Sequence, residues 1–292
     1  MPDFKPRLLV TGAGGQLGRL VVEHLLLLVP AAQVVATVRN ADAGSRLAER
    51  GVDVRIADYT RPETLDAALA GVDRVLLVSS NALGQRVSQH RGVIEAASRA
   101  GVRLLAYTSV LHARTSPLGL AGEHRETEDI LRTSGLPFVL LRNGWYTENY
   151  TASIPAALAH NALLGSAGEG RIASAARADY AAAAAAVLTT NEDWNGRVFE
   201  LAGDEAYTLA EFAREVAHQA GQPVEYANLP EAEYRAALLG AGLPKDLAAL
   251  LADSDASAAD GALFDDGRQL QALIGHPTTP MAASIAAALA QR

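Results

Sequence analysis

The stretch TGAGGQLGRLV (11–21) contains four glycines within seven residues. Ordering a glycine costs more backbone entropy than ordering any other residue, so such a dense cluster points to a need for bare backbone. Gly12, Gly15 and Gly18 have GxxGxxG spacing, and Gly14 adds one more position without a side chain. A loop of this kind allows a phosphate group to reach backbone N–H groups that side chains would otherwise cover.

The position of these glycines between a strand and a helix narrows their interpretation. They follow a strand predicted over 7–11 and lead into a helix predicted near 16–28, where dinucleotide-binding folds place the pyrophosphate. Gly18 would let this helix lie close to the strand. The alternative is a flexible turn followed by a packing glycine. The dinucleotide interpretation assigns the contact to Thr11, Gly12, Gly14, Gly15, Gln16 and Leu17.

Arg39 indicates which dinucleotide binds. An NAD site usually places Asp or Glu at the end of the second strand, about 20 residues after the glycines, where it bonds the ribose 2′-hydroxyl. Here the second predicted strand ends in ATVRN, and Arg39 stands 21 residues after Gly18 with no acidic residue beside it. A guanidinium pairs well with a 2′-phosphate, so the sequence favours NADP(H). The alternative is a solvated arginine at the end of a strand.

Further candidates follow the other predicted strands, because ligands of open α/β sheets lie at the carboxyl ends of the strands. Each candidate could instead satisfy the backbone of its own loop. By position they are Asp58 after the third strand, Ser79 and Ser80 after the fourth, and Thr108 and Ser109 after the fifth.

The elements that would position these residues alternate along the first half of the chain. Strands are predicted over 7–11, 33–38, 53–57, 73–79, 102–109 and 137–142, and helices near 16–28, 43–50, 62–70, 84–100 and 119–134. Continuous Val, Leu and Ile runs favour strands that are buried on both faces by covering helices. The pattern predicts an α/β protein with a Rossmann-type doubly wound parallel sheet.

The second half of the chain is less regular. A helix is predicted over 178–190, a strand over 196–203, and a helix over 208–221, where Thr208 and Glu211 form a capping-box pattern. The remainder is mostly helical. We therefore predict an NADP-binding Rossmann domain over 1–150, rejoined by 171–203, and a small, mostly helical C-terminal, substrate-side lobe formed by 151–170 and 204–292.

Composition argues against several classes of function. The net charge is −8 and no Lys or Arg cluster occurs, which disfavours a nucleic-acid or anionic membrane partner. The chain has no cysteine, and its longest aliphatic stretch (25–29) is far shorter than the ~20 residues of a membrane span. Neither His112 nor His124 has partners at metal-ligand spacing. These features predict a soluble cytoplasmic protein without a metal.

Longer segments carry a resemblance to a known family. The type 2 NADPH:quinone oxidoreductases, in the NmrA-like branch of the atypical short-chain dehydrogenases/reductases, resemble this chain in TGAGGQLG, ADYTRPETLDAALAGVDRVLLVSS, AYTSVLHARTSPLGLAGEH, LLRNGWYTENY and LFDDGRQLQALIGHPTTP. The likeness covers almost the whole chain. It implies a Rossmann domain with a small C-terminal domain, NADPH bound without flavin, and two-electron reduction of quinones. Gly14 departs from the family, in which a threonine is expected.

The same resemblance implies that the segment NGWYTE contributes to the nicotinamide side of the cofactor pocket. The flat rings of Trp145, Tyr146 and Tyr150 could lie against a quinone or nicotinamide ring. A structured turn with aromatic residues in the core is the alternative. The cofactor-binding residues assigned in this way are Asn143, Gly144, Trp145, Tyr146, Thr147 and Glu148.

The sequence lacks the Tyr-xxx-Lys dyad of typical short-chain dehydrogenases. Its two lysines are Lys5 and Lys245, and neither has a tyrosine four residues earlier. His124 and Glu128 have that spacing, and we expect them to be solvated residues of a helix. Reduction of an ordinary ketone would suffer from the missing proton donor. A quinone instead yields a phenolate-like anion, which aromatisation stabilises and water can protonate.

Orientation of the two reacting rings is therefore the expected source of catalysis. Tyr146 and His112 are the catalytic candidates, as hydrogen-bonding partners of a quinone oxygen. Two alternatives remain, a non-catalytic NADP(H)-binding redox sensor of the NmrA type that acts on a protein partner, and a reductase of triarylmethane dyes. A homodimer is also compatible with the sequence.

Overall fold

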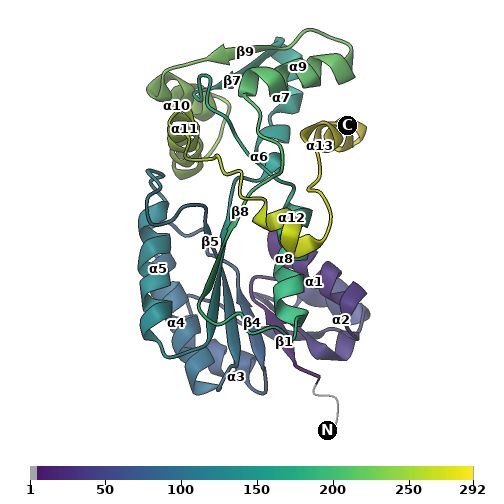
Figure 1. The fold of residues 1–292 in the computed structure, drawn as a ribbon, viewed down its shortest axis with the longest axis vertical. Helices are drawn as coiled ribbons and strands as arrows, with labels where there is room; N and C mark the ends of the chain where they lie inside the picture. The colour runs from purple at the N-terminus through teal and green to yellow at the C-terminus, as the bar shows by residue number, and fades with distance from the viewer. Residues whose placement is uncertain (1–4, 292) are drawn as a thin grey trace. The chain divides into compact units, whose positions relative to one another are not determined.

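A seven-stranded sheet organises the first part of the computed structural model, which describes residues 5–291 (Figure 1). The strands lie in the order β3 (Asp53–Ile56), β2 (Val34–Val38), β1 (Leu8–Val10), β4 (Arg74–Leu77), β5 (Leu104–Val110), β6 (Phe138–Asn143) and β8 (Arg197–Leu201). β1 pairs in parallel with β2 and β4, and the pairs β2–β3 and β4–β5 are also parallel. This order confirms the predicted Rossmann-type doubly wound sheet.

Helices cover both faces of this sheet (Figure 1). One face carries α1 (Gln16–Leu28), α2 (Ser45–Glu49) and α8 (Arg177–Thr189), and the other carries α3 (Leu65–Leu69), α4 (Arg86–Arg99) and α5 (Ala121–Thr133). Short 3-10 turns precede β2, α2 and α3, namely η1 (Ala31–Gln33), η2 (Asp42–Gly44) and η3 (Pro62–Thr64). All residues of β1, β2 and β5 are buried, as expected for strands with helices on both sides.

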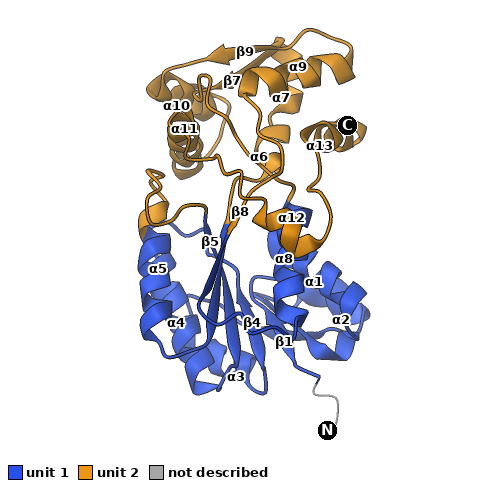
Figure 2. Ribbon diagram, in the orientation of Figure 1, with its two compact units in different colours: residues 1–110, 123–142, 177–199 blue, residues 111–122, 143–176, 200–292 orange. Residues whose placement is uncertain are grey.

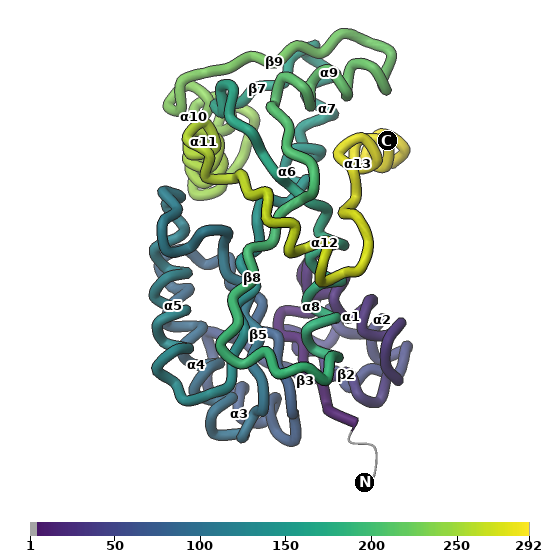
Figure 3. The backbone as a smooth tube through the Cα atoms, viewed as in Figure 1, coloured from purple at the N-terminus to yellow at the C-terminus, as the bar shows by residue number. Residues whose placement is uncertain are grey.

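The alanine-rich helix α8 packs against α1 (Figure 3). Val21, Val22 and Leu25 of α1 are completely buried, and so are Ala183 and Ala185 of α8. The alanines permit a close approach of the two helices because their side chains take little space. Complete burial of one Val or Leu side chain stabilises the fold by about 1.5–3 kcal/mol.

Contacts divide the chain into two compact units (Figure 2). The first unit combines residues 1–110, 123–142 and 177–199, and the second combines 111–122, 143–176 and 200–292. Residues 1–4 and 292, which the predicted domains include, lie outside the described residues. None of the helices within 5–291 combines the length and the apolar character that crossing a membrane requires.

The second unit contains helices and one small sheet. Its helices are α6 (Thr147–Thr151), α7 (Ile154–His160), α9 (Leu209–Ala220), α10 (Glu231–Gly240), α11 (Lys245–Ala259), α12 (Gln269–Ile274) and α13 (Met281–Ala290). The predicted capping box at α9 is present, since Thr208 Oγ1 accepts from the Glu211 backbone N–H (3.1 Å) and Glu211 Oε2 accepts from the Thr208 N–H (2.8 Å).

The small sheet of the second unit was not predicted. β7 (Ala162–Gly165) and β9 (Glu225–Asn228) pair in parallel, and Figure 3 shows them side by side. Each strand has four residues and includes exposed positions, so neither presents the buried apolar run that indicates a strand.

Candidate functional site

A cleft of about 510 Å³ lies in the first unit, where β1, β2, β3 and β4 end. The loops that follow these four strands form its wall, as expected for a ligand site of a doubly wound sheet. The wall includes nine of the residues predicted from sequence, Gly12, Gly14, Gly15, Gln16, Leu17, Arg39, Asp58, Ser79 and Ser80.

The glycine loop brings bare backbone to the edge of the cleft. Gly12 has a φ of 60°, a left-handed conformation that glycine adopts without strain. Gly15 is the N-cap of α1 and has no side chain with which to cap the helix. The first backbone N–H groups of a helix, here those of Gln16 and Leu17, have no partner within the helix. Together with the helix dipole they form a site for an anion.

Two other glycines of the loop differ in how much space surrounds them. A Cβ at Gly18 would lie 2.4 Å from the carbonyl oxygen of Gly12, so this position requires glycine for the close contact of helix and loop. A Cβ at Gly14 would lie 3.4 Å from the Cβ of Ala43, which is an ordinary contact. The structure can therefore accommodate a side chain at Gly14.

Thr11 is buried at the base of the loop and is not part of the cleft wall that we describe. Its hydroxyl donates to the carbonyl of Leu76 (3.0 Å) and accepts from the backbone N–H of Val78 (2.9 Å). It also accepts from the hydroxyl of Tyr59, which does line the cleft. Thr11 thus ties β1 to β4 and holds Tyr59 in the wall.

Arg39 and Asp58 place opposite charges in the cleft wall. Arg39 follows β2, is exposed, and forms no hydrogen bond or ion pair with any residue from 5 to 291. The backbone N–H and the hydroxyl of Thr60 donate to Oδ1 of Asp58 (2.9 and 2.8 Å), and with the charges of Arg39 and Arg61 they hold the Asp58 pKa below its usual value. The guanidinium of Arg39 is available to an anionic ligand.

Thr108 and Ser109, predicted to follow the fifth strand, lie within β5 and bond to the interior of the first unit. Thr108 Oγ1 accepts from the backbone N–H of Ser79 (2.8 Å), and the hydroxyl of Ser109 donates to Oε1 of Glu128 (2.7 Å). Both side chains are buried, and neither of these two hydrogen bonds is made to the backbone of its own loop, which was the alternative expected from sequence. Sequence reasoning missed several wall residues, among them Asn40, Tyr59, Asn81, Gln85 and Gln89. Three of these directly follow predicted residues, which is the signal that could have found them.

The expectation that His124 and Glu128 are solvated is wrong. His124 is 4% exposed and Glu128 is completely buried. Glu128 accepts from Nε and Nη2 of Arg142 (2.8 and 2.7 Å), and Nδ1 of His124 lies 2.7 Å from the hydroxyl of Tyr107. Burial lowers the pKa of His124 well below its ordinary value, and the charge of Arg86 acts in the same direction. His124 is therefore neutral near physiological pH.

Glu128 offers a test of the buried ion pair. Burial alone would raise its pKa, but the hydrogen bonds from Arg142 and Ser109 outweigh burial and hold the pKa below the ordinary value of 4.5. We expect Glu128→Gln to lower the free energy of unfolding by about 2 kcal/mol, because Arg142 keeps a neutral partner only. Urea unfolding measures this. The wild-type advantage is present above pH 4.5 and is lost as the pH falls through the lowered pKa; a pH-independent difference would contradict the assignment.

The segment Asn143–Glu148 lies in the second unit, at the end of β6 and the start of α6. Asn143 is 5% exposed, and its Oδ1 is buried without a hydrogen-bond partner among residues 5–291. Tyr146 is half-buried and forms a β-bridge with Ala175, and Thr147 Oγ1 lies 2.8 Å from the hydroxyl of Ser174. The backbone N–H of Gly144 donates to the carbonyl of Leu201 (2.7 Å).

Three neighbouring side chains of the predicted site differ in their surroundings. Trp145 and Tyr150 are buried, and the Tyr150 hydroxyl donates to Oδ1 of Asp255 (3.0 Å) in the core of the second unit. Glu148 is partly buried in the first turn of α6. Tyr150 thus follows the core-aromatic alternative.

His112 occupies a constrained loop in the second unit. Its φ is 52°, and its backbone N–H donates to Oε2 of Glu200 (2.8 Å). Its Nε2 lies 3.1 Å from the carbonyl oxygen of Phe264 and 3.4 Å from Oδ2 of Asp265. These contacts fix the imidazole within its own unit, and about a third of the side chain remains exposed.

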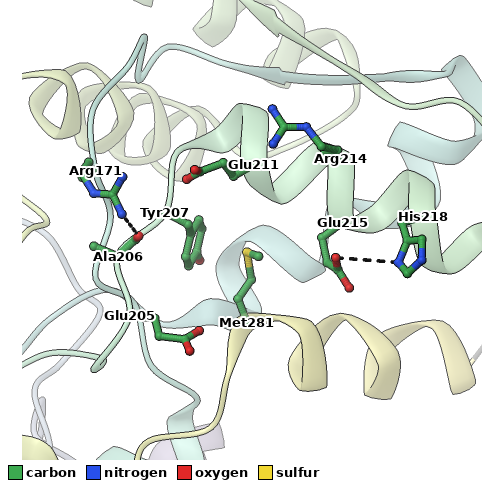
Figure 4. A pocket seen from close by; sticks show the side chains of 9 residues that line it. All are labelled: Arg171, Glu205, Ala206, Tyr207, Glu211, Arg214, Glu215, His218 and Met281. Carbon is green, nitrogen blue, oxygen red and sulfur yellow. Dashed lines mark hydrogen bonds and ion pairs between the residues drawn. The ribbon is translucent and has the colours of Figure 1, made fainter.

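A second hollow, of about 740 Å³, lies in the second unit beside α9 (Figure 4). Arg171 donates to the carbonyl of Ala206, and Nδ1 of His218 lies 3.9 Å from Oε2 of Glu215. Because both signs of charge alternate around the hollow, it lacks the net attraction that a phosphorylated ligand needs. None of the residues predicted from sequence lines it.

A family model with the description NAD(P)H-binding matches residues 12–191, which is more than half of the chain. The chain belongs to this NAD(P)H-binding family. The match includes the glycine loop, Arg39 and all four loops of the cleft.

A protein sequence and a solved structure from Escherichia coli resemble this chain over nearly its full length. Quinone oxidoreductase 2 of Escherichia coli is 56% identical over 276 residues, which cover 94% of this chain and 96% of that protein. A crystal structure of the NADPH-dependent quinone oxidoreductase from Escherichia coli complexed with NADPH has a TM-score of 0.94 at 55% identity and covers 97% and 99% of the two chains.

Two further relatives have other names. The triphenylmethane reductase of Citrobacter sp., solved with NADP(H), is 35% identical with a TM-score of 0.92, covering 96% of this chain and 99% of that chain. An NmrA-like family domain-containing oxidoreductase of Aspergillus flavus is 31% identical over 226 residues, or 75% of this chain and 73% of that protein. These relatives confirm the predicted resemblance to NmrA-like NADPH:quinone oxidoreductases.

Proposed function

We propose that this chain is an NADPH-dependent quinone oxidoreductase that transfers a hydride to a quinone without a flavin or a metal. The observation that carries the proposal is the cleft in which the N-terminus of α1 and the unpaired guanidinium of Arg39 face one space. The 56% identity to quinone oxidoreductase 2 of Escherichia coli supports the acceptor class.

The residues of the cleft fit NADPH in shape and in charge. The backbone N–H groups of Gln16 and Leu17 would bind the pyrophosphate, and Gly15 leaves room for its approach. Arg39 would pair with the 2′-phosphate. NADPH supplies the hydride when bound, and the chain supplies binding and orientation.

The proton needs no dedicated acid on this chain. A quinone that accepts a hydride becomes an aromatic hydroquinone anion, which water can protonate, so the buried and neutral His124 need not act. We assign Asn143–Glu148 to the nicotinamide side of the site, and the buried, unpaired Oδ1 of Asn143 supports this because it can accept from a carboxamide N–H. Tyr146 and His112 are proposed as hydrogen-bonding partners of the quinone oxygen.

Turnover with a quinone tests the proposal directly. Purified protein, NADPH and a benzoquinone are mixed, and oxidation of the nicotinamide is followed by its absorbance. We expect turnover well above the uncatalysed rate, and slower turnover with NADH because NADH has no 2′-phosphate for Arg39. Tight NADPH binding without turnover would contradict the proposed enzymatic activity and favour the alternative of a non-catalytic redox sensor. A triarylmethane dye is the second acceptor to be tested in this assay, because the chain is similar to triphenylmethane reductase.

Three broader features belong to the same proposal. We propose that 1–150 with 171–203 bind the cofactor and that 151–170 and 204–292 contribute the substrate side.

We also propose that the protein is located in the cytoplasm, where NADPH is regenerated. Cell fractionation tests this location. A homodimer is proposed and is tested by light scattering.

A further inference from the structure

Ser80 lines the cleft, and the protein itself engages each of its polar groups. Its backbone N–H donates to Nε2 of His90 (2.9 Å), and its carbonyl accepts from Nε of Arg86 (2.7 Å). Its hydroxyl donates to Oε1 of Gln89 (2.5 Å) and accepts from the backbone N–H of Ala82 (3.1 Å). A residue held in this way has little left to offer a ligand.

The three side chains that hold Ser80 come from one face of α4. Arg86, Gln89 and His90 have i, i+3 and i+4 spacing, which places them on the same side of the helix. They are 6%, 7% and 0% exposed. A buried arginine and a buried histidine need partners of their own, because an unpaired polar group away from water is costly.

Helix α5 supplies these partners one turn apart. Oε2 of Glu123 accepts from Nη1 of Arg86 (2.8 Å), and Oε1 of Glu123 accepts from the backbone N–H of Gly84 (2.9 Å). Thr127 Oγ1 lies 3.1 Å from Nδ1 of His90. Glu123 therefore holds both the arginine that binds Ser80 and the far end of the same loop.

The hydrogen bonds determine the tautomer of His90. Its Nε2 accepts from Ser80, so Nδ1 carries the proton. Thr127 donates its own proton to the carbonyl of Glu123 (2.9 Å) and can therefore accept from Nδ1. Burial and the charge of Arg86 lower the pKa of His90 to about 3, which keeps the imidazole neutral and able to accept from Ser80.

We propose that Arg86, His90, Glu123 and Thr127 are positioning residues, which act through Ser80 to hold the cleft wall at 78–82 in the conformation that binds NADPH. This inference rests on the proposed function, since it requires that the cleft bind NADPH. A wall that is ordered in advance leaves less entropy to lose on binding.

Direct contact with the cofactor then belongs to the neighbours of Ser80. The side chains of Ser79 and Asn81 line the cleft and form no hydrogen bond within residues 5–291. Arg86, Glu123, Thr127 and His90 are not among the residues of the cleft wall, so their substitution reaches the cofactor only through the loop.

Glu123→Gln tests the proposal, with Glu126→Gln as its matched control on the same helix. Glutamine keeps the shape of Glu123 but has a single acceptor oxygen for two donors. We expect the Kd for NADPH, measured by calorimetry, to rise about tenfold in Glu123→Gln, because binding must then order the loop. Exposed Glu126 should leave it within about twofold. Thr127→Val removes the hydroxyl that accepts from His90 and should also raise the Kd for NADPH.

Amide hydrogen exchange supplies a readout that a general loss of stability would not reproduce. In Glu123→Gln without cofactor, amides of 79–85 should exchange faster while those of β1 and β5 are unchanged, and NADPH should restore protection. Unchanged binding and exchange in Glu123→Gln, or equal effects in Glu126→Gln, would overturn the inference. Wild-type protein that fails to bind NADPH would instead overturn the proposed function, and the inference with it.

Discussion

Gly15→Val is expected to lose measurable affinity for NADPH and NADH alike while it keeps its fold. Gly15 has φ −83° and ψ 171°, an extended conformation that valine also adopts. Its Cβ would lie 3.2 Å from the carbonyl oxygen of Gly12, a tight contact that a shift of a few tenths of an ångström in the loop relieves. The branched side chain would occupy the space through which a pyrophosphate reaches the N–H groups of Gln16 and Leu17. Losing two hydrogen bonds to a charged group costs about 3 kcal/mol or more, which raises the Kd at least about 100-fold.

Gly14→Ala is the matched control for this substitution. Its Cβ would meet Ala43 at 3.4 Å and Val38 Cγ1 at 3.8 Å, which are ordinary contacts that leave the loop in place. Calorimetry on both variants, with circular dichroism to verify folding, separates a blocked site from a disturbed turn. A folded Gly15→Val variant that retained its affinity would show that the loop only turns the chain.

Arg39→Ala is expected to raise the Kd for NADPH by about 10–100-fold, because hydrogen bonds to charged groups contribute about 1.5–3 kcal/mol. The Kd for NADH should change by less than about threefold, since no 2′-phosphate is present to lose a partner. The preference for NADPH would therefore nearly disappear. Titration of each cofactor with wild type and variant measures the two effects independently.

Arg46→Ala controls for the loss of one positive charge near the cleft. Arg46 is exposed on α2 and does not line the cleft, so only long-range electrostatics should change. Raising the ionic strength would remove that contribution. An equal loss of NADPH and NADH affinity in Arg39→Ala would assign Arg39 to the fold of the loop instead of to the phosphate.

Most strands of the sheet could be predicted because each is marked by apolar residues that are consecutive in the sequence. β1 (LLV) is apolar throughout, β2 (VVATV) has one threonine, and β5 (LLAYTSV) begins with a mostly apolar stretch. The helix predicted near 16–28 begins and ends at those residues in α1. β7 and β9 were not predictable in the same way, because their pairing depends on residues about 60 positions apart and their side chains are partly exposed.

The same distinction applies to the site. The roles of Arg39 and the glycines in cofactor binding could be predicted from sequence because each follows directly after a recognisable strand. Glu128 of α5 can be buried because it bonds to Arg142 of β6 and Ser109 of β5, which lie 14 and 19 residues away in the sequence. The expectation that Glu128 is a solvated residue of a helix could not take such distant partners into account.

The connectivity of the two units has a consequence for biosynthesis and for evolution. The chain passes from one unit to the other after residues 110, 122, 142, 176 and 199. Helix α8 packs on α1, β4 and β5. It is synthesised only after the second-unit segments 111–122 and 143–176. Premature termination would thus leave β4 and β5 uncovered on that face of the sheet. Recombination between relatives should succeed only when it exchanges several segments together, because neither unit is a contiguous gene fragment.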